Sequence, residues 1–142
     1  MYFQRIRYLR EQYEYTQGYV ANYLKCKRST YANWETGNII LPLEIASKLA
    51  ILYNVPLSYI LGIKLNYDST KVKPINYEYM IKKLNLLKQE NKHSYEKISR
   101  YIDTNRSTTN RYFNNKISIP TDKLVLLCEL YNIEIDDLCG TR

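Results

Sequence analysis

The stretch TQGYVANYLKCKRSTYANWETG, residues 16–37, decides how the rest of the chain folds. It is typical of two short helices joined by a tight bend. The hydroxyl of Thr16 can accept a free backbone N–H of the first helical turn. A bend at 25–27 then precedes a second helix, which begins at Arg28. Three apolar residues of the first helix share one face at helical spacing: Val20, Ala21 and Leu24.

The second helix, expected over 28–35, has two different faces. Tyr31 and Trp34 lie three residues apart and point to the same side. The opposite side has no large apolar residue and carries Arg28, Ser29, Ala32 and Asn33. A short helix with one anchored aromatic face and one free face of Arg, Ser and Asn is suited to insertion into the major groove of DNA.

A longer register extends this pattern in both directions. The run TQ-x-x-V-A-x-x-L is followed by RST-x-x-x-WE-x-G, and then by Pro42, Leu49 and Asn54-Val55. Over about sixty residues without a gap, this register resembles the phage-repressor Cro/cI-type (XRE) helix-turn-helix family. The resemblance implies a lambda-repressor-like domain of five helices, double-stranded DNA as the partner, and a role in transcription regulation, most often repression. It also implies a protein of bacterial or phage origin without enzymatic activity.

The sequence repeats itself after 78 residues, and the alignment needs no gap. The shift places Arg28-Ser29-Thr30 on Arg106-Ser107-Thr108, and Leu52-Tyr53-Asn54 on Leu130-Tyr131-Asn132. We therefore expect an all-α protein with two tandem five-helix domains and a second recognition helix over 106–113. The expected boundaries are 1–66 for the first domain, 67–78 for the linker and 79–142 for the second domain. The whole stretch 63–78 breaks the helical periodicity, and a segment of about 15 residues can stretch to roughly 50 Å, so both copies can reach one duplex.

The outward faces of the two recognition helices are the expected base-reading surfaces. Arg28 and Arg106 open these helices, and the planar fork of arginine matches guanine N7 and O6. Asn33 follows one turn later, where an amide can bond bidentately to adenine, and Arg111 takes its place in the second copy. The expected base contacts are Arg28, Ser29, Asn33, Arg106, Ser107, Asn110 and Arg111.

Contacts to the DNA backbone are expected at helix starts and in the loops after the recognition helices, where this family meets phosphates. These residues are Gln17, Lys27, Asn38 and Lys116. The second copy has Tyr95 in place of Gln17 and Phe113 in place of Glu35. These two changes leave an alternative open, in which the C-terminal repeat is a module for homodimerisation or partner binding, as in an antitoxin-like repressor.

Several backbone positions call for a left-handed conformation. Lys25 stands at the bend where the family usually has glycine, which would cost ~1 kcal/mol if its φ is positive. Asp103 suits the equivalent bend better, and Asn105 is a better helix cap than Lys27. Asn54 is expected to end its helix in the left-handed region.

The charge balance favours a polyanionic partner, because 21 Lys and Arg face 14 Asp and Glu, for a net charge of +7. An anionic membrane surface competes with nucleic acid for this interpretation. No apolar run approaches the ~20 residues that span a bilayer, and the first residues lack the apolar segment of a signal peptide. We therefore expect a cytoplasmic protein that does not insert into a membrane.

The remaining chemistry argues against an enzyme, a metal site or a cofactor. Three cysteines form no C-x-x-C pair and are expected to be buried free thiols: Cys26, Cys128 and Cys139. His93 is the only histidine, and no glycine-rich phosphate loop is present. Sixteen tyrosines could instead stack on single-stranded bases, but no alternating aromatic and basic strand supports that function.

Core packing is the simpler explanation for five of these tyrosines: Tyr31, Tyr53, Tyr101, Tyr112 and Tyr131. A first helix is expected to bury Ile6, Leu9 and Tyr13. Its solvent side is expected to carry Arg5, Arg7 and Arg10.

Overall fold

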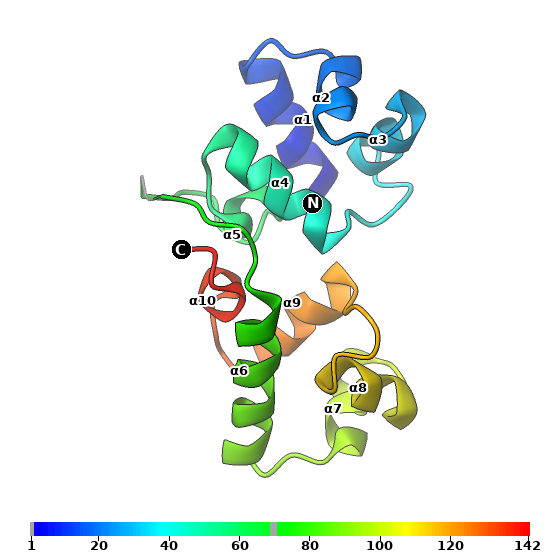
Figure 1. Ribbon diagram of the computed structural model, residues 1–142, viewed down its shortest axis with the longest axis vertical. Coiled ribbons are helices and arrows are strands. Elements are labelled where there is room, and N and C mark those ends of the chain that lie inside the picture. The colour runs from blue at the N-terminus through cyan, green and yellow to red at the C-terminus, as the bar shows by residue number, and fades with distance from the viewer. Residues whose placement is uncertain (1, 69–70) are drawn as a thin grey trace. The chain divides into compact units, whose positions relative to one another are not determined.

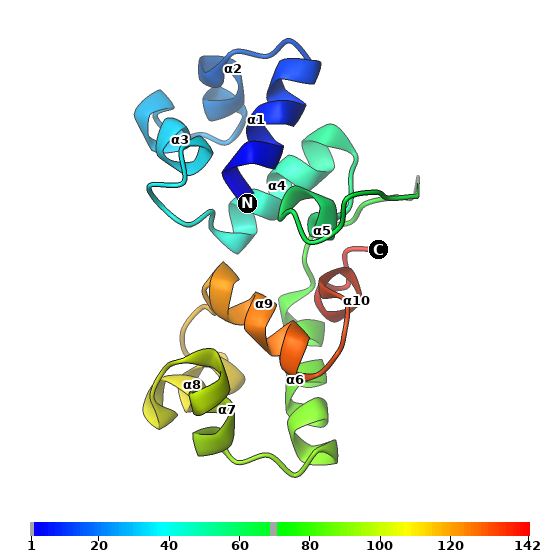
Figure 2. The ribbon, with the colours of Figure 1, turned by 180° about the vertical axis from the view of Figure 1, so that it is seen from behind.

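The computed structural model describes residues 2–68 and 71–142, with the side chains of the first helix described from residue 4 on. Within these ranges there are ten helices and no strand, so the expected all-α class is confirmed. The chain divides into two units, Met1–Pro74 with Thr141–Arg142, and Ile75–Gly140. Figures 1 and 2 show the five helices of each unit from two sides.

The two units use the same order of helices. Unit 1 contains α1 (Tyr2–Gln12), α2 (Gln17–Tyr23), α3 (Arg28–Glu35), α4 (Leu43–Tyr53) and α5 (Leu57–Ile60). Unit 2 contains α6 (Tyr77–Glu90), α7 (Tyr95–Ile102), α8 (Arg106–Phe113), α9 (Thr121–Leu130) and α10 (Ile135–Cys139). A shift of 78 residues places the first and last residues of α3 on the first and last residues of α8. Helix α6 begins at Tyr77, inside the stretch 67–78 that the sequence suggests as a linker.

The same shift relates the core residues of the two units. Each of five aligned pairs is at most 2 % exposed: Ile6 and Leu84, Val20 and Ile98, Leu49 and Leu127, Leu57 and Ile135, Ile60 and Leu138. The first helix of each unit packs against the third and fifth helices, α1 on α3 and α5, and α6 on α8 and α10. Burial of each such side chain stabilises its unit by about 1.5–3 kcal/mol. The same helical spacing of apolar residues therefore produces the same five-helix fold in both units.

The tight bends also recur at the same places. All described residues with positive φ form five pairs under the shift: Glu14 and Lys92, Lys25 and Asp103, Gly37 and Asn115, Asn54 and Asn132, Gly62 and Gly140. φ at Lys25 is positive, at 58°, so the condition for the cost considered above is met. The left-handed end of α4 at Asn54 is confirmed. The left-handed conformation is unfavourable for Lys25, whereas Asp103 tolerates it because its short polar side chain can form a local hydrogen bond.

Side-chain caps start three of the four helices in the helix-turn-helix pairs. Thr16 Oγ1 accepts the backbone N–H of Tyr19 at 3.0 Å, and Ser94 Oγ accepts that of Lys97 at 3.1 Å. The second recognition helix is capped by Asn105, as expected. The first recognition helix, α3, is preceded by Lys27, whose side chain makes no capping hydrogen bond. A missing cap costs a helix ~1 kcal/mol, so α3 depends more than α8 on its packing.

The burial of some residues differs from expectation. Tyr101 was expected in the core but is 46 % exposed, because the next residue, Ile102, occupies the inward position of α7. Tyr13 is also exposed, because α1 ends at Gln12. Among the cysteines, Cys26 is only half-buried. Burial of the thiols is confirmed for the other two cysteines, at 128 and 139.

Candidate nucleic-acid interface

The recognition helices are held by their inner faces. In each unit of Figure 1 the helix-turn-helix pair lies side by side, α2 with α3 and α7 with α8. The buried residues of α3 are Tyr31, Trp34 and Glu35, and those of α8 are Thr109, Tyr112 and Phe113. The rings of Tyr31 and Trp34 meet edge to face, with centroids 6.4 Å apart. This packing leaves the opposite face of each helix free to meet a ligand.

The residues expected to contact bases lie on those free faces. All of them are exposed except Asn33, which is half-buried. In unit 2 the structure brings four of them together around one shallow, open depression of about 580 Å³: Arg106, Ser107, Asn110 and Arg111. Two guanidinium groups, a hydroxyl and an amide thus converge on a single outward surface. Donors of this kind match the acceptor-rich edges of base pairs in a major groove.

A second asparagine orients the amide of each candidate reader. In unit 1, Asn38 Nδ2 donates to Asn33 Oδ1 at 3.4 Å. In unit 2, Asn114 Nδ2 donates to Asn110 Oδ1 at 3.1 Å and also to the Asn110 backbone carbonyl at 2.8 Å. Each reader amide therefore accepts one hydrogen bond within the protein, and its NH₂ group and the second lone pair of its oxygen can still bond to a base. Sequence inspection gave Asn38 a contact to the DNA backbone and did not assign Asn114 a role.

Gln17 belongs to a buried network centred on Glu35. Gln17 Nε2 donates to Glu35 Oε2 at 2.9 Å, and the Tyr31 hydroxyl donates to Oε1 at 2.8 Å. Arg10 donates to both carboxylate oxygens through Nε and Nη2, and through Nη1 to the Tyr15 carbonyl at 3.0 Å. One carboxylate thus connects α1, α2 and α3. The expectation that Arg10 lies on the solvent side of α1 is wrong, because this ion pair draws its side chain inward to 14 % exposure.

The ionisation of this network follows from its hydrogen bonds. Burial by itself would raise the pKa of Glu35. The hydrogen bonds from Arg10, Gln17 and Tyr31 outweigh burial, and they hold the pKa of the carboxyl below its usual value. The same bond from Arg10 to Glu35 raises the pKa of the guanidinium. The carboxylate is therefore ionised at neutral pH and fixes the position of Gln17, at the start of α2.

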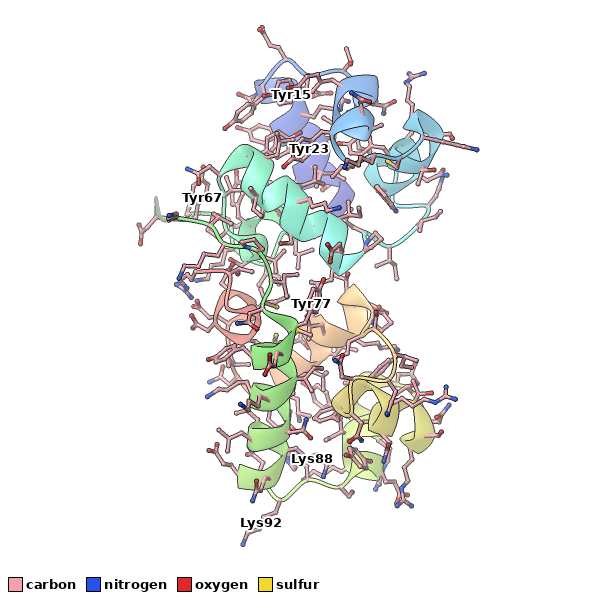
Figure 3. The ribbon with its side chains drawn as sticks, in the orientation of Figure 1. Tyr15, Tyr23, Tyr67, Tyr77, Lys88 and Lys92 are labelled. Atoms are coloured by element: carbon pink, nitrogen blue, oxygen red, sulfur yellow. The ribbon has the colours of Figure 1, made fainter. Side chains whose placement is uncertain are left out.

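Unit 2 replaces this network with a different set of contacts. The positions of Arg10, Gln17, Tyr31 and Glu35 are taken there by Lys88, Tyr95, Thr109 and Phe113. The Lys88 ammonium lies 4.3 Å from the centroid of the Tyr95 ring, and that ring meets Phe113 edge to face with centroids 5.9 Å apart. Figure 3 labels Lys88 on α6. Thr109 Oγ1 shares a 2.6 Å hydrogen bond with Ser99 Oγ, which stands at the position of an alanine in unit 1. These contacts of unit 2 therefore form without a carboxylate at their centre.

Comparison with known proteins agrees with this geometry. A family model described as Helix-turn-helix matches the chain twice, over residues 6–60 and 84–138. The chain belongs to the XRE-type, Cro/cI-like helix-turn-helix family, in two tandem copies. Members of this family are DNA-binding regulators of transcription and are typically not enzymes. No curated protein and no solved structure is significantly similar to the chain.

The remaining candidate residues lie next to the recognition helices. Lys27 immediately precedes α3, Asn38 lies in the loop after it, and Lys116 occupies the corresponding loop after α8. All three side chains are exposed. Among the described residues, no helix is long and apolar enough to cross a bilayer, and no cluster of metal-binding side chains is found.

Proposed function

We propose that the protein is a sequence-specific regulator that binds double-stranded DNA and acts as a transcriptional repressor. The observation that carries this proposal is the pair of outward helix faces that both begin with Arg-Ser, at 28–29 and 106–107, and remain exposed while their inner faces are buried. Repression would follow from occupation of promoter DNA. Such a regulator would act in the cytoplasm of a bacterial cell, on host or mobile-element genes.

In this mechanism, phosphate contacts position the protein and supply much of its affinity. Gln17, Lys27, Asn38 and Lys116 are the proposed phosphate contacts. The carboxylate of Glu35 contributes indirectly, because it holds the Gln17 amide at the start of α2.

Base reading is assigned to the two outward faces. Arg28 and Arg106 each present a fork that can bond guanine N7 and O6. The amides of Asn33 and Asn110 present NH₂ donors, and these two residues are not aligned with each other by the 78-residue shift. The two copies would therefore recognise related half-sites that share a guanine and differ at the neighbouring base pairs. The proposed DNA-binding domains are residues 1–66 and 79–142.

A second function for the C-terminal copy is supported by charge. Residues 1–74 carry ten Lys or Arg against five Asp or Glu, whereas residues 75–140 carry ten against nine. A nearly neutral copy without the network of Glu35 suits dimerisation or capture of a protein partner. In that case only unit 1 binds DNA.

Selection from random duplexes followed by binding isotherms tests the proposed function. Arg28→Ala should weaken binding to the selected site by ~1–3 kcal/mol and relax preference at one base pair. Lys27→Ala should weaken binding to all sequences about equally and flatten the salt dependence. If selection recovers no motif, or if Arg28→Ala leaves affinity and preference unchanged, the assignment of α3 as a reading helix is wrong.

The double variant Arg106→Ala/Arg111→Ala separates the two functions of unit 2. If both copies read DNA, it should lose most of the ~10²-fold gain that tethering gives the full chain over residues 1–66. Equal binding by the double variant and the unmodified chain would support the partner-binding function instead.

A further inference from the structure

The end of the second recognition helix carries a side chain that bonds back to a candidate reader. Asn114 directly follows α8, and Asn110 lies in the last turn of that helix with its side chain exposed. We propose that Asn114 is a specificity-determining residue, which sets the base preference of Asn110 without contacting DNA itself. This inference rests on the proposed function, because it names what controls one of the reading residues of α8.

One NH₂ group joins the two asparagines. Asn114 Nδ2 donates to the Asn110 backbone carbonyl at 2.8 Å and to Asn110 Oδ1 at 3.1 Å. The Tyr95 hydroxyl is a third acceptor, at 3.4 Å. An amide carries two N–H protons, and the two shorter bonds have the better geometry to use them. The Asn114 side chain is therefore committed to Asn110.

The backbone that carries Asn114 is itself fixed. Its N–H donates to the Asn110 carbonyl at 3.0 Å, so this carbonyl accepts from both the backbone and the side chain of one residue. The chain then turns through Asn115, whose φ is 55°, and the N–H of Lys116 donates to the Arg111 carbonyl at 2.9 Å. This is the bond of a Schellman motif, which closes the end of a helix. Asn114 thus holds the movable amide of Asn110 from a rigid position.

Unit 1 holds its own reader at the same two atoms. Thr36 stands at the position equivalent to Asn114, and its Oγ1 donates to the Asn33 backbone carbonyl at 3.3 Å. Asn38 Nδ2 donates to Asn33 Oδ1 at 3.4 Å. Two residues do there what Asn114 does alone in unit 2, and their bonds are longer. An arrangement that recurs with different residues favours a shared requirement over an incidental surface bond.

These bonds decide which atoms of Asn110 are presented to a base. Asn114 engages one lone pair of Asn110 Oδ1 and so fixes the plane of the amide, whose NH₂ group stays free to donate. Without that bond the amide can rotate about its broad terminal torsion and exchange donor for acceptor. Guanine presents only acceptors in the major groove and cytosine presents a donor, so the ratio of these two bases reports the direction of the amide.

The effect of Asn114 should pass through Asn110 alone. The described residues that line the open depression on α8 include Asn110 but not Asn114. An unsupported Asn110 would also have to lose its rotational freedom when it binds a base, which weakens discrimination further.

Selection from random duplexes with the full chain and its variants tests the proposal. Asn110→Ala identifies the base pair that this residue reads, because preference should relax there. Asn114→Ala should relax preference at the same base pair by at least ~3-fold and leave the half-site of unit 1 unchanged. The double variant should be no more relaxed than Asn110→Ala, since Asn114 acts only through its neighbour.

A change from donor to acceptor gives a directional result. The carboxylate of Asn114→Asp cannot donate, and it should accept from Asn110 Nδ2 instead, which turns Asn110 Oδ1 outward. The ratio of guanine to cytosine at this base pair should therefore fall by at least ~3-fold. The added negative charge should weaken binding to all sequences alike, so it does not affect this ratio.

Asn91 provides the matched control. It directly follows α6, and its Nδ2 donates to the Leu87 carbonyl four residues earlier at 2.8 Å, whereas the leucine side chain offers no acceptor. Asn91→Ala removes the same kind of bond at a helix end and should leave the selected motif unchanged. An equal change of motif in Asn91→Ala would assign the effect to lost stability and overturn the proposal.

NMR relaxation of the Asn110 side-chain NH₂ group examines the hydrogen bond without DNA. Its order parameter on the ps–ns timescale should fall in Asn114→Ala and stay unchanged in Asn91→Ala. An order parameter that does not respond to Asn114→Ala would show that Asn114 does not hold the reader.

The outcomes separate this inference from the proposed function. If Asn110→Ala relaxes one base pair and Asn114→Ala does not, or if the two changes are additive, the role of Asn114 is wrong and reading by α8 stands. If selection recovers no motif, or if Asn110→Ala changes nothing, reading by Asn110 fails and the role of Asn114 in specificity fails with it, even where the order parameter falls.

Discussion

Replacement of Glu35 by glutamine is the sharpest test of how unit 1 holds its recognition helix. Glu35→Gln keeps the size of the side chain and removes the charge. It leaves the Arg10 guanidinium, whose side chain is 14 % exposed, without its counter-ion, and it takes one oxygen acceptor from the network. Loss of one partner from a buried ion pair typically costs 3–5 kcal/mol, because the other charge stays desolvated.

The expected loss is a large part of the free energy of unfolding of unit 1. A unit of this size has a free energy of unfolding of about 3–10 kcal/mol, so Glu35→Gln should remove about half of it or more. Urea unfolding of the full chain can follow unit 1 alone through the fluorescence of Trp34, the only tryptophan. The midpoint of that transition should fall by about 2 M or more.

Two further variants keep this result interpretable. Glu11→Gln removes the exposed i,i+4 pair with Arg7, whose side chains are 66 % and 52 % exposed, and should cost under ~0.5 kcal/mol. Arg10→Leu combined with Glu35→Leu removes both charges and should recover part of the loss. If Glu35→Gln costs no more than Glu11→Gln, the carboxylate does not organise α1, α2 and α3, and the argument fails.

The remaining predictions concern backbone conformation and pH. Lys25→Gly should stabilise unit 1 by about 0.5–1 kcal/mol in the same urea assay, because φ at this position is 58°, and Asp103→Gly should change unit 2 by less; a loss of stability in Lys25→Gly would contradict the strain. Since the folded pKa of Glu35 is depressed, its contribution is fully present above the unfolded value of about 4.3 and is lost as pH falls through the folded pKa. Trp34 fluorescence should therefore report unfolding of unit 1 at lower urea concentrations below about pH 4, and this additional pH dependence should vanish in Glu35→Gln.

The fold was predictable because its determinants are local and repeated. Apolar residues at helical spacing, the cap at Thr16 and the cap at Asn105 each act within one turn of their own helix. Because the repeat has no gap, the second copy supports the interpretation of each pattern at the equivalent position of the first. The positive φ at Lys25 could be inferred even though lysine is a poor residue for it, because the motif leaves no other place for the bend.

The buried network was not predictable from local pattern. Arg10 and Glu35 are 25 residues apart, and helical spacing assigns the arginine to the polar side of α1. The sequence shows that Gln17 and Glu35 both change in the second copy, but it does not connect either change with Arg10 or Tyr31. The available signal was that Glu35 and its three hydrogen-bond partners, Arg10, Gln17 and Tyr31, all change between the copies. Only their contacts in space show that these substitutions form one set.

The orientation of the candidate readers was also outside the reach of the sequence. The hydrogen bond between Asn114 and Asn110 joins the residue directly after α8 to a residue in the last turn of that helix. The residues expected to contact bases follow from the motif, whereas the direction in which each amide points depends on neighbours that the motif does not specify.

The different inner faces of α3 and α8 have a consequence for protein engineering. The two helices have equal length and are entered and left through equivalent bends, so a chimera carrying α8 in unit 1 would keep the chain in register. Its Phe113 would nevertheless meet the guanidinium of Arg10, which would be left buried beside an aromatic ring. A successful graft would also have to import the partners at 88, 95 and 99. New DNA specificities should therefore be easier to build by changing outward residues, or by exchanging complete units, than by transplanting a recognition helix on its own.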